Sequence, residues 1–73
     1  MDTDVLKVLN ELRKDGEFSR IKDIEKFSEK LFWAHYKRKD IPSEIRKASL
    51  WIFSNPKRKK KNYSRFLTNW MAK

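Results

Sequence analysis

Apolar residues recur at intervals of three and four residues in four separate segments of this 73-residue chain. That spacing places them on one side of an α-helix, whereas a half-buried strand would alternate apolar and polar residues. One Gly, two Pro and few β-branched runs also favour helices. We therefore predict an all-α fold, a small single-domain bundle of about four helices over residues 3–14, 20–37, 42–54 and 57–72.

Several residues at the ends of these segments are typical of helix termini. Thr3 or Asp2 can cap the first helix, and Gly16 lies just past its end, where a left-handed residue is expected. Ser19 is the candidate cap of the second helix, and Pro42 lies near the first position of the third. The predicted apolar stripes are Val5, Val8, Leu9 and Leu12; Ile21, Ile24, Ser28, Leu31, Phe32 and His35; Ile41, Ile45, Ala48 and Ile52; Tyr63, Phe66, Leu67, Trp70 and Met71.

The start of the last helix has two interpretations. Asn55 can cap a helix with Pro56 at its first position, or Asn62 can cap a shorter helix and leave the lysines in a loop. In the longer version, cations fill the first turns, where each costs about 0.3–1 kcal/mol. Stability alone would not select that arrangement, so the longer helix would indicate a bound anion.

The length of the chain limits the size of its core, and the absence of cysteine excludes disulfides. Three Trp, five Phe and two Tyr supply large apolar surfaces instead. No apolar stretch approaches the roughly 20 residues that cross a bilayer, and the acidic start "MDTDVLKVLN" is unlike a signal peptide. We expect a cytoplasmic protein without a membrane partner.

Charge is distributed unevenly along the chain. Residues 1–36 hold seven Lys/Arg and eight Asp/Glu, a net charge of −1, whereas residues 37–73 hold twelve and two, a net charge of +10. This asymmetry indicates an anionic partner of the second half, and nucleic acid is the first candidate. A lysine run that is merely solvated is the alternative. The predicted phosphate-binding residues are Lys57, Arg58, Lys59, Lys60, Lys61 and Arg65, supported by Lys37, Arg38, Lys39, Arg46 and Lys47.

Several apolar residues fall outside the predicted stripes, and three of them are candidate contact residues. Trp33 lies on the side of Lys26 and Lys30, where it either stacks on a nucleic-acid base or packs at the edge of the core. Leu50 and Phe53 lie away from the stripe of the third helix and can form a partner surface or a homodimer seam.

No set of residues indicates catalysis. His35 falls on an apolar stripe with no second His and no Cys, so we interpret it as a structural histidine whose hydrogen bonds are satisfied. A single Gly excludes a glycine-rich phosphate loop, and no nucleophile and base stand together. We expect no enzyme activity, no metal site and no cofactor.

The segment "IRKASLWIFSNPKRKKKNYSRFLTNWM" resembles the C-terminal helical module of phage and prophage replication proteins, the replisome organisers and helicase-loader-like proteins. The matching features are a Trp-containing helix, an Asn-Pro, a Lys/Arg run, and an aromatic–Arg–Phe–x–x–Asn–Trp ending. "LFWAHYKRK" at 31–39 also resembles their "FWxxYPRK" element, with Lys37 in place of Pro. The likeness covers about residues 31–72 and implies a module that acts in phage DNA replication or a neighbouring DNA transaction.

Together these observations predict a non-catalytic, basic nucleic-acid-binding protein that is phage-encoded and contacts backbone phosphates with weak sequence specificity. DNA is favoured over RNA as its target. One alternative is an adaptor whose third helix docks a replication protein or helicase. Another is a phage inhibitor of a host nucleic-acid enzyme.

Overall fold

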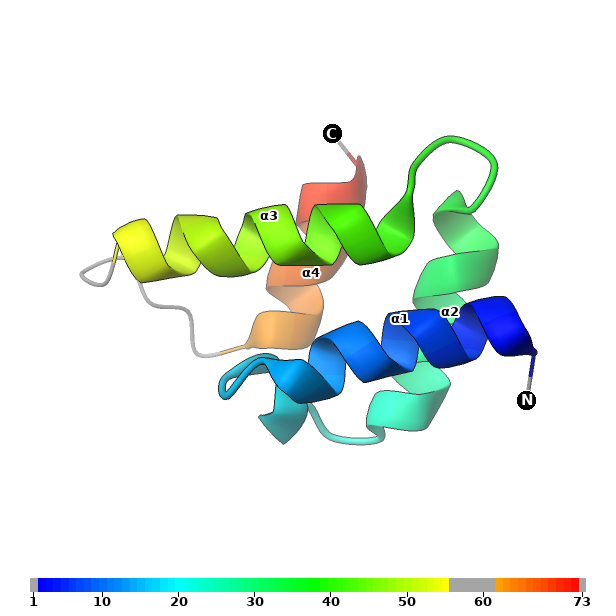
Figure 1. Ribbon diagram of the computed structural model, residues 1–73, viewed down its shortest axis with the longest axis horizontal. Coiled ribbons are helices and arrows are strands. Elements are labelled where there is room, and N and C mark those ends of the chain that lie inside the picture. Colours follow the sequence, from blue (N-terminus) through cyan, green and yellow to red (C-terminus); the bar gives the residue numbers. More distant parts are fainter. Residues whose placement is uncertain (1, 56–61, 73) are drawn as a thin grey trace.

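The computed structural model describes residues 2–55 and 62–72, and these residues form four α-helices and one short 3-10 helix (Figure 1). No strand occurs in these two ranges, so the all-α prediction is confirmed. The elements are α1 (Thr3–Lys14), η1 (Phe18–Arg20), α2 (Ile24–His35), α3 (Ile41–Ser54) and α4 (Tyr63–Ala72).

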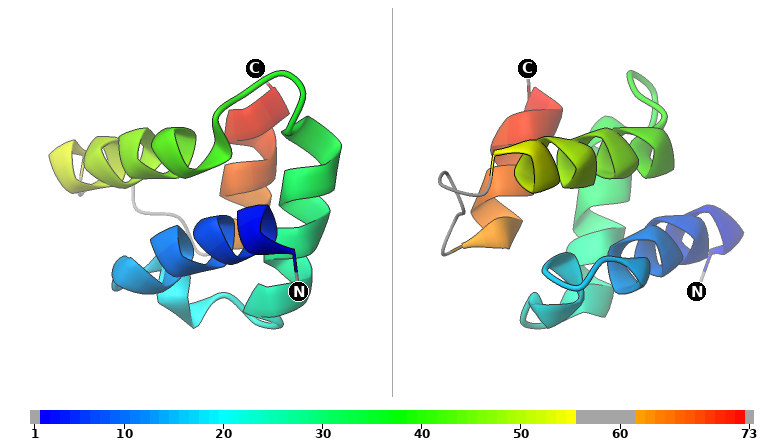
Figure 2. Two further views of the ribbon diagram at one scale, coloured as in Figure 1. Left: turned by 45° about the vertical axis from the view of Figure 1, so that its right-hand side comes forward. Right: turned by 60° about the vertical axis from the view of Figure 1, so that its left-hand side comes forward.

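The four α-helices form two layers. α1 and α3 lie side by side and run in the same direction, and α2 and α4 cross behind them, also in a common direction (Figures 1 and 2). The core lies between the layers, where the apolar stripe of each helix is buried. The buried apolar residues are Val5, Val8, Leu9, Leu12, Phe18, Leu31, Ile41, Ile45, Ala48, Ile52, Leu67 and Met71.

α1 begins at the cap that the sequence offers but ends differently from the prediction. The Asp2 carboxylate accepts the backbone N–H of Asp4 at 2.8 Å, which satisfies a free donor of the first turn. Gly16 does not adopt the predicted left-handed conformation. Asp15 closes α1 with extended backbone, and its carboxylate accepts the N–H groups of Glu17 and Phe18 at 2.8 and 3.0 Å.

The second helix begins later than residue 20, so its predicted range of 20–37 is wrong. Phe18 is fully buried and anchors the separate turn η1. Ile21 is then extended, and Asp23 has φ 53°, so the chain cannot continue as one helix. Ser19 does not cap α2, because its hydroxyl donates to the Gly16 carbonyl at 3.2 Å. The helix ends at His35, before a turn at residues 36–38.

α3 begins at Ile41, one residue before the predicted start, and ends at Ser54 as predicted. The Asp40 carboxylate accepts the Ser43 N–H at 3.4 Å, and Pro42 occupies the first turn, where its missing N–H is not needed.

α4 begins at Tyr63, which agrees with the shorter of the two predicted helices. Asn62 lies outside the helix, and its side-chain oxygen accepts the Arg65 N–H at 3.1 Å, as an N-cap does. The predicted range of 57–72 therefore does not form one uninterrupted helix. Residues 57–61 lie outside the described ranges.

Aromatic rings join α4 to the rest of the bundle. Phe66 stacks on Trp51 of α3 with ring centroids 5.8 Å apart, and Trp51 meets Trp70 at 6.4 Å. Phe18 of η1 meets Tyr63 edge-on at 5.7 Å and lies 6.5 Å from Phe66. Trp51 and Trp70 thus pack against the core, and Trp70 belongs to the predicted stripe of the last helix.

Candidate nucleic-acid interface

The predicted lysine run, Lys57 to Lys61, lies outside the described residues, so the candidate site is built from the cations that the structure places. These cations do not gather on one face. Arg65 lies in a groove between α2 and α4, whereas Arg46 lies in a groove between α1 and α3, in the other layer. The two grooves differ in the charges that line them.

The groove between α2 and α4 has a volume of about 310 Å³. Its apolar lining comes from Phe27, Leu31 and Ala34 of α2. The exposed cations Lys30 and Arg65 lie on opposite helices, and none of the described residues that line the groove carries a carboxylate. A groove with an apolar lining and two cations suits a ligand that carries both an apolar part and a negative charge.

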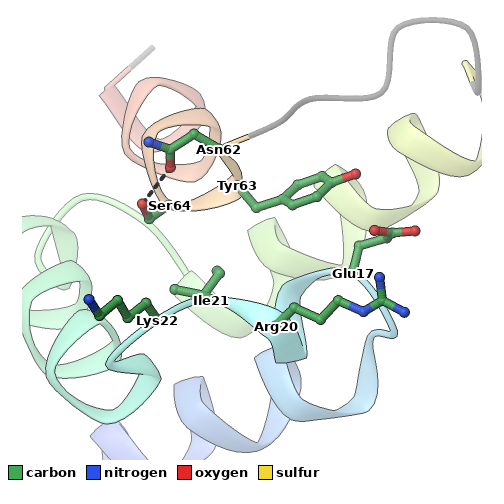
Figure 3. Close-up of a pocket in the computed structure, with 7 residues that line it drawn as sticks. All are labelled: Glu17, Arg20, Ile21, Lys22, Asn62, Tyr63 and Ser64. Carbon is green, nitrogen blue, oxygen red and sulfur yellow. Dashed lines mark hydrogen bonds between the residues drawn. The ribbon is translucent and has the colours of Figure 1, made fainter.

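A second depression adjoins this groove at the start of α4. It has a volume of about 500 Å³ (Figure 3). Its lining comes from η1 and the residues on either side of it, namely Glu17, Arg20, Ile21 and Lys22, and from Asn62 to Ser64. Ser64 lines both depressions. The Arg20 side chain extends toward Glu17, whereas that of Lys22 extends away from it (Figure 3). Four cations from three segments therefore border the first half of α4: Arg20, Lys22, Lys30 and Arg65.

Three of these four cations are absent from the predicted set. Lys30 was recognisable in the sequence, since it follows Lys26 by four residues on the helix face that also carries Trp33. No pattern in the sequence indicated Arg20 and Lys22, because both fall within the continuous helix predicted for residues 20–37. The break between η1 and α2 brings them to the start of α4.

The groove between α1 and α3 contains acidic as well as basic residues. Glu11 pairs with Lys14 at 3.5 Å and with Arg46 at 3.6 Å. Asp15 also lines this groove and accepts a hydrogen bond from the Ser49 hydroxyl. A phosphate here would lie near carboxylates as well as cations. Its electrostatic attraction would therefore be weaker than in the groove between α2 and α4.

The other predicted cations lie in varied surroundings. Lys47 pairs with Glu44 at 3.2 Å. The Lys37 ammonium lies 5.7 Å from the centre of the Tyr36 ring, and Arg38 is exposed in the same turn. Lys39 is half-buried and lines a depression with Asp4 and Asp40. The structure thus does not bring these residues together with Arg65.

Trp33 is 54% exposed, so it is not a core residue at the edge of the bundle. Its ring meets Phe32 edge-on at 5.1 Å and Tyr36 edge-on at 5.4 Å. Trp51 and Trp70, in contrast, are half-buried among other rings. The stacking interpretation of Trp33 is therefore compatible with its place on the surface.

His35 does not have the satisfied hydrogen bonds that the sequence analysis predicted. Its Nδ1 atom is buried and has no hydrogen-bond partner among the described residues, while the side chain lines the groove between α2 and α4. A buried nitrogen without a partner costs free energy, so this atom is a point where a ligand could form a hydrogen bond.

Leu50 and Phe53 form an exposed apolar patch near the end of α3. Leu50 is 66% exposed and Phe53 84% exposed, so α3 presents apolar side chains away from its buried stripe. Isolated exposed apolar residues are common, but two on one short helix mark a candidate contact surface.

Residues 2–55 and 62–72 contain no group of three His, Cys, Asp or Glu that could hold a metal ion. Within the same ranges, the helices are too short and too polar to cross a bilayer. No family model, curated protein or solved structure matches the chain. The candidate interface therefore depends on its own geometry and charge.

Proposed function

We propose that this chain is a non-catalytic nucleic-acid-binding protein that contacts backbone phosphates with weak sequence specificity. The observation that carries this proposal is the groove between α2 and α4, which Lys30 and Arg65 line and which has no carboxylate among its described lining residues. Phosphate contacts supply affinity without reading bases, and a surface of lysine and arginine side chains fits that mode.

The sequence supports the same proposal. The second half of the chain carries a net charge of +10, and the five cations Lys57 to Lys61 lie directly before Asn62, the cap of α4. We propose that these lysines extend the contacts of Lys30 and Arg65 along the nucleic-acid backbone. Arg46 and Lys47 contribute less, because Glu11 and Glu44 already offset their charges.

The resemblance to phage replication proteins gives a biological setting for this activity. We propose that the protein acts in phage DNA replication or a neighbouring DNA transaction, with DNA as its target. The motifs that carry the resemblance include Arg65, Phe66 and Trp70, and the last two pack α4 against α3. In this setting the aromatic residues hold α4 in place and the basic residues bind the phosphates.

Fluorescence anisotropy with labelled DNA at about 50 to 300 mM salt tests the proposal, because phosphate-driven affinity falls steeply over this range. We expect binding whose logarithm falls with the logarithm of salt at a slope of magnitude about five or more, as several phosphate contacts require. The variant Lys59→Glu with Lys61→Glu should lose most binding and keep its helical circular dichroism. Absence of binding by the unmodified protein at the lowest salt would exclude the function.

An adaptor function is the second candidate, because Leu50 and Phe53 are so exposed. In that case α3 docks a replication protein or helicase, and the basic residues assist encounter only. Leu50→Asp and Phe53→Asp would then abolish capture of the partner and leave DNA binding unchanged. The lysine variants would show the reverse pattern if the protein binds nucleic acid directly.

A further inference from the structure

One exposed face of α2 combines cations with an aromatic ring. Lys26, Lys30 and Trp33 are spaced by four and three residues, so they share a side of the helix. All three are exposed, and they lie opposite the buried residues Ser28 and Leu31. We call these three residues the α2 strip.

The surroundings of Trp33 hold its ring in place. Phe32 and Tyr36 both meet it edge-on, at interplanar angles of 80° and 78°. Two aromatic neighbours restrict the rotation of the indole, so less conformational entropy is lost when a flat group packs against it. Trp33 is a large apolar ring on the surface that contributes little to the core, and its exposed part can contact a ligand.

Cations other than Lys26 lie near the α2 strip. Lys30 belongs both to the α2 strip and to the groove between α2 and α4, where Arg65 faces it from α4. Lys37 follows in the turn after α2, with its ammonium 5.7 Å from the centre of the Tyr36 ring. The aromatic surface therefore adjoins positive charges that complement phosphates.

We propose that the α2 strip binds single-stranded nucleic acid, with a base stacked on Trp33 and the adjacent phosphates held by Lys26, Lys30 and Arg65. This proposal rests on the proposed function and specifies the form of its target. In a duplex the faces of the bases are covered by their neighbours, whereas a single strand can present a base face to an indole. A duplex offers phosphates to the lysines but nothing that Trp33 can stack on.

The experiment compares Trp33→Ala with Trp33→Phe, using labelled single-stranded oligothymidine and a duplex of the same length. Loss of one base–aromatic stack weakens single-strand binding by about 5- to 150-fold, so we expect a loss in this range for Trp33→Ala. Trp33→Phe should retain most of the affinity, and duplex binding should change little in either variant. Leu50→Ala, which removes an exposed apolar side chain from α3, is the matched control and should bind as the unmodified protein does.

Tryptophan fluorescence provides an independent readout. Trp33 is exposed while Trp51 and Trp70 are half-buried, so oligothymidine should quench mainly the Trp33 emission. We expect this quenching in the unmodified protein and its loss in Trp33→Phe. Because phenylalanine keeps a ring at this position, Trp33→Phe still tests the proposal even where Trp33→Ala disturbs the fold.

Three results would overturn the proposal, and they separate it from the proposed function. Equal losses of single-strand and duplex affinity in Trp33→Ala would mean that the ring acts through the fold. Unchanged single-strand affinity in Trp33→Ala, together with quenching that persists in Trp33→Phe, would remove the stacking role but leave phosphate binding intact. No binding of either form of DNA by the unmodified protein would remove both proposals at once.

Discussion

In the groove between α1 and α3, Glu11 pairs with Lys14 and Arg46. In the same groove, Asp15 accepts a hydrogen bond from the Ser49 hydroxyl. In the groove between α2 and α4, Lys30 and Arg65 lie on opposite helices beside apolar residues, and the part of the lining that the structure describes contains no carboxylate. Charged groups connect the helices of the first groove, whereas the described lining of the second groove holds cations without a carboxylate. Whether the charge of a lysine or arginine is offset therefore depends on the helices that its side chain lies between.

The largest expected effect comes from breaking the contact between η1 and α4. Phe18→Ala removes a fully buried ring that packs against Tyr63 and Phe66, at a cost of about 3–5 kcal/mol. The free energy of unfolding of a chain of this length is about 4–11 kcal/mol. Urea unfolding followed by circular dichroism should therefore show that the variant is barely stable. Phe53→Ala, at an exposed position, should change the free energy of unfolding by less than about 0.5 kcal/mol. Similar losses in both variants would contradict the assignment of Phe18 to the core.

A smaller loss of stability is expected in the groove between α1 and α3. Asp15→Ala removes the acceptor of two backbone N–H groups and of the Ser49 hydroxyl, which should cost about 2 kcal/mol. Thermal unfolding measures the effect, and Glu29→Ala, at an exposed position of α2, is the control. DNA affinity at a temperature where both variants are folded should not fall. A fall would mean that this groove takes part in binding after all.

Two matched double variants test whether the cations of the two grooves contribute differently to DNA binding. Lys30→Gln with Arg65→Gln and Arg46→Gln with Lys47→Gln each remove two positive charges. The Lys30→Gln, Arg65→Gln double variant should reduce the magnitude of the salt slope for duplex DNA by about 1.8, because two phosphate contacts are lost. The second pair should change the slope much less, since both cations already face carboxylates. Equal changes would show that only the net charge matters.

The smallest effect is expected for Glu11→Gln, which removes the carboxylate shared by Lys14 and Arg46. Surface ion pairs contribute little, so the free energy of unfolding should fall by about 0.5 kcal/mol or less. The released cations should raise DNA affinity slightly at low salt, which anisotropy can detect. A large loss of stability would mean that Glu11 is a main connection between α1 and α3.

Local patterns in the sequence predicted much of the secondary structure. The buried stripes of α1 and α3 follow helical spacing, and the caps Asp2 and Asn62 are of residue types that accept backbone N–H groups. The start of α2 was missed, because Phe18 enters the core from a separate turn and Asp23 takes a left-handed conformation. The burial of Phe18 depends on its contacts with Tyr63 and Phe66 of α4, which periodicity cannot reveal.

The candidate site was predicted only in part. Net charge indicated an anionic partner, and Arg65 and Trp33 were recognised from their positions on helices. Lys30 was not assigned to the site, and the separation of Arg46 from Arg65 depends on which helices are neighbours. Charge is a sum over residues and can be counted in the sequence, whereas a groove without carboxylates is a property of two packed helices.

From the sequence alone it follows that this chain is helical, that apolar residues at helical spacing form the core, and that its second half is strongly basic. These are consequences of local spacing and composition. Only the tertiary structure decided that Phe18 is central, that Trp33 remains on the surface, and that Lys30 and Arg65 share a groove. The physical reason is that burial and charge pairing depend on which helices pack together, and that packing is settled by the whole chain at once.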